Sequence, residues 1–328
     1  MKICIVGAGA IGGFLGTHLA CEGTAHVAAL ARGATLAALR EHGWRLQQPA
    51  GLPLAVPVAQ ASDDPRALGP QDLVILAVKS PALPALAPQL APLLHAGTVL
   101  LPAMNGVPWW FSAGLPALGE RPLESVDPGG RIAAALPPER VIGCVVHASA
   151  TTAAPGVTLH RMGRGLIIGE PAGGDSPRVE RLCALLGRAG FEVTASPRIR
   201  YDVWYKLWGN MTMNPVSALT GASMDRVLDD ELVREFCSGV MREAAAVGAR
   251  IGCEVRESAE DRHAVTRRLG AFKTSMLQDV EAARALELDA LVGAVREIGQ
   301  RVGVSTPGID ALFGLTRLFG RVRGLYPL

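Results

Sequence analysis

The sequence predicts an α/β protein of two domains, the first built on a parallel sheet and the second on helices alone. Its 328 residues fit two domains at roughly 150 residues each. Up to Thr194 the pattern is one of short apolar runs of strand length, separated by turns and helical segments. After Ser196-Pro197 long helical patterns follow. We therefore expect a Rossmann-type domain over residues 1–196 and an all-α domain over residues 197–328.

Composition and charge argue against several kinds of partner. The formal charge is +2, from 32 basic and 30 acidic residues, so neither a nucleic-acid-binding face nor a membrane-binding face is expected. The six cysteines show no CxxC pair and no zinc spacing, which is typical of reduced thiols, and no metal site is expected. No signal segment precedes the first strand-like run, and no uncharged apolar run reaches ~18 residues. We expect a cytoplasmic protein.

The first predicted strand, Lys2 to Val6, is followed at once by a glycine-rich turn and a helical segment from Gly13 to Glu22. This order of strand, GxGxxG and helix is the context of a dinucleotide-binding fingerprint. The glycines permit a tight turn and close approach of a pyrophosphate, and the helix N-terminus attracts its negative charge. The alternative is an ordinary glycine-rich turn. The expected cofactor contacts are Gly7, Ala8, Gly9, Ala10, Ile11 and Gly12.

The second predicted strand, His26 to Ala31, runs into Arg32. About 20 residues after the fingerprint, an NAD enzyme usually carries an Asp or Glu that binds the ribose 2′-hydroxyl group. A cation at this place suits a 2′-phosphate instead, so the sequence favours NADPH over NADH. The alternative is a solvated arginine in a loop.

Two further apolar strands, Leu73 to Val78 and Val99 to Leu101, are followed by polar residues. The first runs into Lys79 and the second leads to Asn105. Ligands of open parallel sheets bind beyond the carboxyl ends of the strands, so both side chains are expected near cofactor and substrate. Between the strands, four prolines predict a kinked or broken helix, because a proline inside a helix costs about 3 kcal/mol.

The remainder of the first domain carries less chemistry. Trp109 and Trp110 either wall a substrate pocket or serve as packing, and the sequence favours neither interpretation. Residues 120–138 are rich in Gly and Pro and predict a surface excursion. The other expected elements are a hairpin from Trp44 to Val58, strands at Val141 to His147, Val157 to Leu159, Leu166 to Ile168 and Phe191 to Thr194, and a helix from Arg178 to Ala189.

The stretch from Tyr201 to Pro215 carries the clearest chemical signal. On a helix with ~100° per residue, Lys206, Asn210 and Asn214 line one face. Bulky apolar residues surround them, which predicts a buried helix, where a lysine is costly unless partnered and readily has its pKa lowered. The functional interpretation is a lysine acid with two amides that orient a small polar molecule. The alternative is a solvated polar stripe on a surface helix.

Two later helices are expected, from Val227 to Ile251 and from Ser275 to about Val302. Ser275 opens an S-x-x-Q capping box, so it is either the N-cap of its helix or a substrate contact. Glu287 has apolar neighbours that would partly bury its carboxylate. The alternative for Glu287 is a surface ion pair with Arg284.

Taken together, these motifs resemble the ketopantoate reductases (2-dehydropantoate 2-reductases), a branch of the 6-phosphogluconate-dehydrogenase-like enzymes. The resemblance runs from end to end. Its marks are GAGAIGG, AVKS, MNG, PGVTLHRMGRGLIIGEP, KLWGNMTMNPVSALTG and TSMLQDVEAARALELDAL. The last two are specific to the family, whereas the first is shared by many dinucleotide enzymes.

The resemblance implies NADPH-dependent reduction of 2-dehydropantoate to pantoate, a step of pantothenate and coenzyme A biosynthesis. It implies that Lys206 is the general acid, that Glu287 anchors the substrate hydroxyl, and that Asn105 lies between nicotinamide and substrate. It further implies substrate contacts by Asn210, Asn214 and Ser275, and cofactor contacts by Arg32 and Lys79. A homodimer is compatible with it.

Other functions stay open at this point. The paired tryptophans and the 120–138 segment depart from the simplest family pattern, so another 2-keto acid could be the substrate. A non-catalytic NADPH-binding sensor is a second alternative, which the retention of Lys206, both asparagines and Glu287 argues against. A dehydrogenase of an amino-acid-derived or phosphorylated substrate is a third, and it would call for further basic residues in the pocket.

Overall fold

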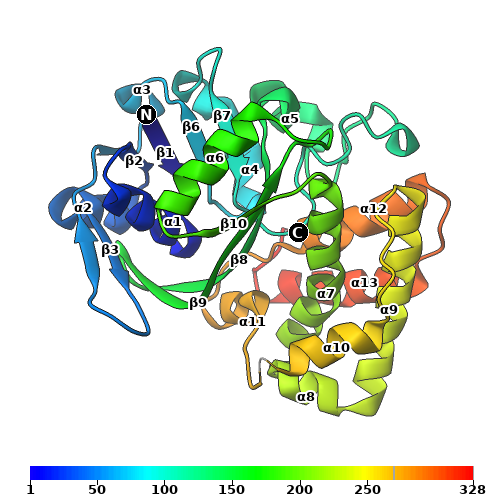
Figure 1. Cartoon of the computed structure of the whole chain (residues 1–328). Helices are drawn as coiled ribbons and strands as arrows, with labels where there is room; N and C mark the ends of the chain where they lie inside the picture. The colour runs from blue at the N-terminus through cyan, green and yellow to red at the C-terminus, as the bar shows by residue number, and fades with distance from the viewer. Residues whose placement is uncertain (269, 328) are drawn as a thin grey trace. The chain divides into compact units, whose positions relative to one another are not determined.

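The structure of the chain, a computed structural model, describes residues 1–268 and 270–327 (Figure 1). It contains two compact units. The first consists of Met1–Met104 and Arg131–Asp202, and the second of Asn105–Gly130 and Val203–Leu328.

This division differs from the expected boundary after Ser196. It falls inside helix α7 (Ile199–Thr220), and residues 105–130 belong with the helical unit rather than with the sheet. Aromatic packing accounts for the difference, because the ring of Phe111 stacks on that of Trp204 with centroids 6.0 Å apart.

The first unit is built on a parallel sheet with the strand order β5-β2-β1-β6-β7. β1 pairs with β2 on one side and with β6 on the other, and all four pairings are parallel. Counted along the chain, this is the order 3-2-1-4-5 of a doubly wound sheet, whose switch point lies between β1 and β6. The strands are β1 (Lys2–Val6), β2 (His26–Leu30), β5 (Ala61–Ser62), β6 (Leu73–Leu76) and β7 (Val99–Pro102).

The segment between β6 and β7 confirms the predicted helix break. It forms three short pieces instead of one helix, and Pro92 lies inside the last of them. The helices of this sheet are α1 (Ala10–Glu22), α2 (Gly33–His42), α3 (Pro65–Leu68), η1 (Ser80–Ala82), α4 (Leu83–Leu86) and η2 (Ala87–Leu93).

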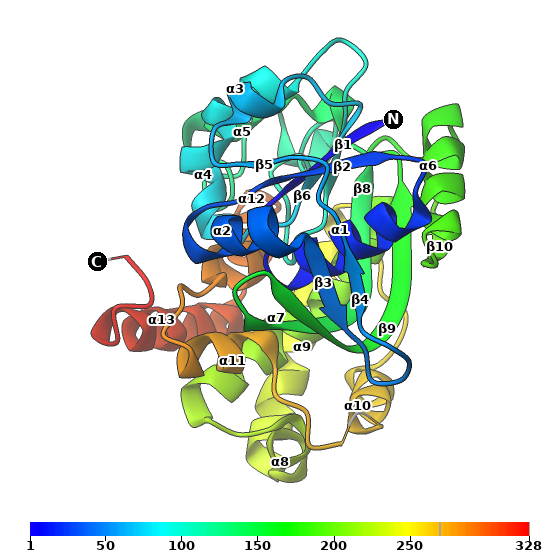
Figure 2. The same ribbon diagram turned by 90° about the vertical axis from the view of Figure 1, so that its left-hand side faces the viewer.

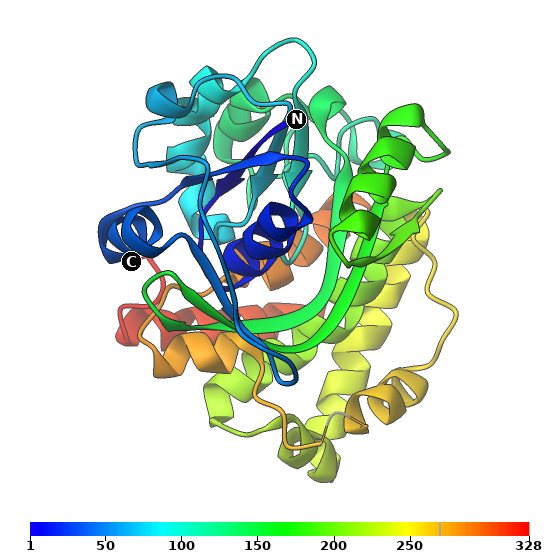
Figure 3. The ribbon, with the colours of Figure 1, turned by 60° about the vertical axis from the view of Figure 1, so that its left-hand side comes forward.

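A second sheet, with the order β10-β9-β3-β4 and with β8 paired to β9, completes the first unit. β8 (Gly143–Ala154) and β9 (Val157–Gly169) form a long curved hairpin, drawn in green in Figure 3. The prediction of two short strands within β9 is wrong, because the polar residues between them keep their backbone pairing with β8 while residues 161–163 are exposed. The predicted hairpin near Trp44 is confirmed: β3 (Trp44–Gln47) pairs antiparallel with β4 (Leu54–Val56).

The 120–138 segment is not the surface excursion that was expected. Leu123, Ile132 and Leu136 are fully buried, as is the side chain of Asp127. Apolar anchors of this kind hold a chain that is otherwise rich in turns. The elements around it and after it are η4 (Pro128–Gly130), α5 (Arg131–Ala135), η5 (Pro138–Arg140), α6 (Pro177–Arg188) and β10 (Glu192–Ala195).

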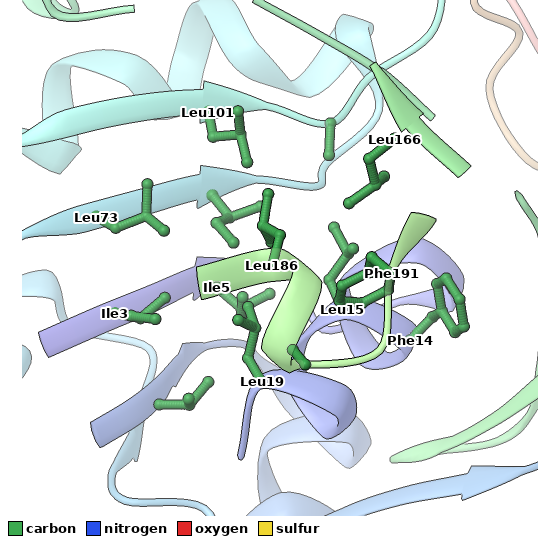
Figure 4. Packing of buried hydrophobic residues seen from close by; sticks show 14 of the residues in the cluster. Ile3, Ile5, Phe14, Leu15, Leu19, Leu73, Leu101, Leu166, Leu186 and Phe191 are labelled. Carbon is green, nitrogen blue, oxygen red and sulfur yellow. The ribbon is translucent and has the colours of Figure 1, made fainter. Parts of the chain in front are cut away.

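Helix α1 packs between the two sheets of the first unit (Figure 2). Its side chains Phe14 and Leu15 belong to one apolar cluster with Ile5 of β1, Leu186 of α6 and Phe191 (Figure 4). Glycines permit this close packing. A Cβ atom on Gly13 would lie 2.0 Å from Oγ1 of Thr158 in β9, and one on Gly16 would lie 2.6 Å from the ring of Trp44 in β3.

The second unit is helical. The helix expected from Val227 to Ile251 divides into two at Asp230, whose side chain accepts a hydrogen bond from the N–H of Val233 and so caps the second. The elements, after α7, are α8 (Met224–Asp229), α9 (Glu231–Arg250), α10 (Ala259–Arg267), α11 (Ser275–Glu281), η6 (Asp289–Gly293), α12 (Ala294–Arg301) and α13 (Pro307–Val322), with η3 (Pro116–Leu118) from the earlier segment.

The prediction of one helix from Ser275 to about Val302 is wrong. α11 ends at Glu281, and Ala283 takes a left-handed conformation with φ +50°. The N–H of Leu286 then donates to the carbonyl of Leu325 instead of continuing a helix. Contacts with the C-terminal segment thus override the local helical pattern.

Two further observations concern the thiol groups and the length of the apolar helices. All six cysteines are free thiols, four of them buried. Within residues 1–268 and 270–327, no helix combines the length and the apolar character that crossing a bilayer requires.

Candidate active site

The glycine-rich turn lies at the carboxyl end of β1, beside the switch point of the parallel sheet. A Cβ atom on Gly12 would lie 1.9 Å from the carbonyl oxygen of Gly7, and Gly7 itself has φ +92°. Gly9, in contrast, is exposed, and a Cβ atom there would meet nothing within 4 Å. Gly7 and Gly12 therefore make the turn tight, while Gly9 leaves its outer side open to a ligand.

This turn suits an anion. α1 begins at Ala10, its N-cap Gly9 offers no side chain to the first N–H groups, and the first turn contains no acidic residue. The N–H groups and the positive end of the helix dipole are thus available to a negatively charged ligand. A narrow turn with an open face and an uncapped helix fits the pyrophosphate of a dinucleotide.

Two cations follow the neighbouring strands. Arg32 comes after β2 and is exposed at the start of α2, and Lys79 comes after β6 and precedes η1. Because β2, β1 and β6 are adjacent and parallel, their carboxyl ends lie at one edge of the sheet. The glycine turn, Arg32 and Lys79 therefore lie along the same edge.

In the second unit, α7 has the buried character predicted for it. Trp204, Leu207, Trp208 and Met211 are at most 2% exposed, so the alternative of a solvated stripe on a surface helix is wrong. Lys206 and Asn210 are half-buried and Asn214 is buried. The three polar side chains thus lie on a helix whose flanks are apolar.

Two hydrogen bonds connect this stripe with other segments of the second unit. Nζ of Lys206 donates to Oδ1 of Asn105 at 2.8 Å. Nδ2 of Asn214 donates to Oγ of Ser275 at 3.5 Å, near the upper limit for a hydrogen bond. Four of the residues predicted to carry the chemistry therefore form two pairs, each between distant parts of the sequence.

The role of Ser275 as an N-cap is excluded by the local geometry. Thr274 is the N-cap of α11, and its side chain accepts a hydrogen bond from the N–H of Leu277 at 3.1 Å. Ser275 is the first residue of the helix and is exposed. Its hydroxyl is therefore not committed to capping the helix.

Glu287 is 9% exposed and lies two residues before the π-helical turn η6. The alternative for Glu287 was a surface ion pair with Arg284, but Arg284 pairs with another residue. Its Nε atom donates to Oδ1 of Asp279 at 3.1 Å. Glu287 is thus a buried acidic side chain of the second unit, as its apolar neighbours predicted.

Sequence reasoning did not predict the hydrogen bonds by which Glu297 and Arg301 hold residues 118–125. Oε1 and Oε2 of Glu297 accept hydrogen bonds from the N–H groups of Glu124 and Ser125 at 2.9 and 2.8 Å. Arg301, one turn later on α12, donates to the carbonyls of Arg121 and Pro122 and to Glu297. The i,i+4 spacing of Glu297 and Arg301 is a visible signal of a pair, but not of its partners.

Trp109 and Trp110 are 3% and 0% exposed, so they serve as packing. No group of three or more His, Cys, Asp or Glu side chains within the described ranges is arranged to hold a metal ion.

Both parts of the chain match models of known families. Residues 3–173 match the family described as ketopantoate reductase PanE/ApbA, and residues 198–319 match ketopantoate reductase PanE/ApbA C terminal. Among curated proteins, a 2-dehydropantoate 2-reductase of Mesorhizobium japonicum is 42% identical over 328 residues, which is 99% of this chain and 100% of the relative.

Solved structures agree with this relationship. A candidate ketopantoate reductase of Ralstonia solanacearum MolK2 is 57% identical with a TM-score of 0.93, and the match covers 99% of each chain. A D-mandelate dehydrogenase solved with NADH and anilino(oxo)acetate shares the fold, with 22% identity and a TM-score of 0.82 over 99% of this chain and 100% of that one. By the family models and the full-length relative, the chain belongs to the ketopantoate reductase family.

Proposed function

We propose that the chain is an NADPH-dependent reductase that converts 2-dehydropantoate to pantoate, a step of pantothenate and coenzyme A biosynthesis. Family membership supports the reaction class, and the 2-dehydropantoate 2-reductase of Mesorhizobium japonicum supports the substrate. One observation carries the mechanism: an ammonium group on an apolar helix is hydrogen-bonded to the amide of Asn105.

The first unit would hold the cofactor. The turn from Gly7 to Gly12 would receive the pyrophosphate against the start of α1, and Arg32 and Lys79 would contact the cofactor from the same edge of the sheet. Arg32 offers a guanidinium group, which suits a 2′-phosphate better than a hydroxyl group. When bound, NADPH supplies the hydride that reduces the C2 ketone.

Lys206 would act as the general acid. Negative charge develops on the ketone oxygen during reduction, so a proton held at Nζ stabilises the transition state more than the ground state. Asn105 orients this group, because its Oδ1 accepts a hydrogen bond from one of the three N–H donors of the ammonium. The apolar flanks of α7 limit the access of competing water.

The other polar residues would bind and orient the substrate. The buried carboxylate of Glu287 can accept a hydrogen bond from the substrate hydroxyl group. Ser275 accepts from Asn214, so its own O–H is left to donate to the substrate carboxylate. Asn210, one turn after Lys206, would supply a further amide.

This proposal assigns cofactor binding to residues 1–196 and substrate binding and catalysis chiefly to residues 197–328, with Asn105 contributed by the earlier segment. It includes a cytoplasmic location, which is consistent with a biosynthetic reaction and with six free thiols.

Homodimer formation is also part of the proposal. Leu315, Leu318 and Val322 are 61%, 62% and 79% exposed on α13. Their spacing of three and four residues places them on one face of the helix, and an exposed apolar stripe of this kind is typical of helix pairing. Light scattering of the purified protein measures the oligomeric state directly.

The test of the function is NADPH oxidation by the purified full-length protein with a panel of 2-keto acids. The panel contains 2-dehydropantoate, other branched 2-keto acids, an aromatic 2-keto acid and a phosphorylated one. We expect the highest kcat/KM for 2-dehydropantoate. A higher kcat/KM for another compound in the panel would make that compound the substrate in place of 2-dehydropantoate. NADPH binding without any turnover would instead indicate a sensor.

A further inference from the structure

The turn that follows Asn105 is held against a distant helix of the same unit. The N–H of Val107 donates to the carbonyl oxygen of Ala290 at 2.8 Å. Gly106 has φ +83°, and a Cβ atom there would lie 2.6 Å from that oxygen and 2.7 Å from Cβ of Ala290. Only glycine fits this position without moving the backbone of one segment or the other.

The carbonyl of Ala290 is available because the helix is irregular at this point. In an α-helix the N–H of Ala294 would donate to it, four residues back. Here η6 is a π-helical turn, and the N–H of Ala294 donates to Asp289 instead, five residues back. The π turn thus offers the Ala290 carbonyl to the N–H of Val107.

Neighbouring contacts hold the π turn from the C-terminal side. The hydroxyl of Tyr326 donates to Oδ1 of Asp289, the first residue of η6, at 2.6 Å. The N–H of Leu286, just before Glu287, donates to the carbonyl of Leu325. The turn is therefore fixed on both sides: by the segment from Asn105 to Val107 and by the segment at Leu325 and Tyr326.

We propose that the π turn at Ala290 is a positioning device for the reduction: it fixes the Asn105–Val107 turn, and through Asn105 it fixes the ammonium group of Lys206. Gly106 is then a positioning residue, since its backbone connects the Ala290 contact with the Asn105 side chain. The inference rests on the proposed role of Lys206 as general acid. It adds that the position of the Lys206 ammonium group depends on the π turn, which lies outside α7.

The kinetic test compares two substitutions at Gly106 with the same two at Gly114. Gly106→Ala adds both the Cβ contact and the strain of positive φ, whereas Gly106→Asn adds the contact at a residue type that tolerates positive φ. Gly114 lies on the same segment with φ +70°, and a Cβ atom there would meet nothing within 4 Å, so its variants report strain alone. We expect both Gly106 variants to lower kcat by roughly 10- to 100-fold, the scale of a displaced catalytic group. The KM for the substrate should change less, and both Gly114 variants should turn over like the wild type.

A second measurement is independent of activity. The chain contains four lysines, Lys2, Lys79, Lys206 and Lys273, so the ¹³Cε resonances of labelled lysine can be followed individually in NMR spectra. We expect the Lys206 resonance and its pH titration to change in both Gly106 variants and to stay unchanged in both Gly114 variants. The Ala290→Gly variant removes the Cβ atom packed on Gly106 and should change the same resonance, which provides a test if the Gly106 variants do not fold.

The two measurements separate this inference from the proposed function. A wild-type protein without reductase activity would overturn the function, and the Lys206 resonance would still decide whether the π turn positions the ammonium group. An unchanged Lys206 resonance and wild-type kcat in folded Gly106→Asn would overturn the inference. So would an unchanged resonance in Ala290→Gly if neither Gly106 variant folds.

Discussion

The hydrogen bond from Nζ of Lys206 to Oδ1 of Asn105, 2.8 Å long, joins residues that are 101 positions apart in the sequence. An amide oxygen orients an ammonium group without adding a negative charge beside it, unlike a carboxylate. A lysine held in this way keeps a defined direction on a helix with apolar flanks. That combination suits a group that donates a proton in a fixed direction.

The first prediction concerns the choice of cofactor. Arg32→Ala should weaken NADPH binding by roughly 10- to 100-fold, because a hydrogen-bonded charge pair contributes about 1.5–3 kcal/mol. The affinity for NADH, which has no 2′-phosphate, should change little. Isothermal titration with both nucleotides measures the ratio, and Arg40→Ala on the same helix is the matched control. Equal losses for both nucleotides would remove Arg32 from the phosphate site.

The second prediction separates the two roles of the glycine turn. Gly9→Ala should fold normally, since its Cβ atom meets nothing within 4 Å, yet it should bind NADPH more weakly because the methyl group occupies the ligand side. Gly12→Ala should lower the melting temperature, because its Cβ atom would lie 1.9 Å from the carbonyl of Gly7. Thermal melts with and without NADPH test both variants. A Gly9→Ala protein with wild-type NADPH affinity would contradict the assignment of this turn.

The third prediction is a pH dependence of stability. Burial raises the pKa of Glu297, but hydrogen bonds from Ser125, Glu124 and Arg301 outweigh it, so the folded-state pKa lies below the usual value of 4.5. A depressed pKa stabilises the folded state above pH 4.5, and this contribution is lost as pH falls through the folded-state pKa. The Glu297→Gln variant should therefore be less stable than the wild type at pH 7, by about 1.5–3 kcal/mol.

Denaturant titrations of the wild type and Glu297→Gln between neutral and acidic pH measure this difference. The gap should narrow as the pH falls below the usual glutamate pKa. Glu235→Gln, which breaks an exposed pair with Arg242, is the control and should change stability by less than about 1 kcal/mol. A gap that stays constant across the pH range would mean that the Glu297 charge does not hold the 118–125 segment.

Features that depend on neighbouring residues could be predicted from the sequence. The GxGxxG turn could be predicted because its glycines are close in sequence and pack against each other, as Gly7 and Gly12 do. The burial of α7 could be predicted because bulky apolar residues surround Lys206 on nearly every side of the helix. The helix break between β6 and β7 could be predicted as well, because a proline disrupts a helix through its own ring and missing N–H group.

Features that depend on distant partners could not be predicted. The N-cap of α11 is Thr274 rather than Ser275. Serine and threonine both cap helices well, so the sequence does not distinguish between two neighbouring residues of this kind. The break after Glu281 and the π turn at Ala290 arise from contacts with Leu325 and Val107, which local periodicity does not contain. Asn105 could be located at the end of a strand, but its contact with Lys206 required the fold.

The measurement that tests the account most directly is the turnover of Lys206→Ala with 2-dehydropantoate and NADPH. Lys273→Ala, which removes an exposed lysine paired with Glu281, is the matched control. We expect Lys206→Ala to bind NADPH like the wild type and to lose kcat by at least ~100-fold, the usual scale for a general acid, while Lys273→Ala keeps its activity. Wild-type kcat in a folded Lys206→Ala protein would contradict the assignment of Lys206 as the proton donor.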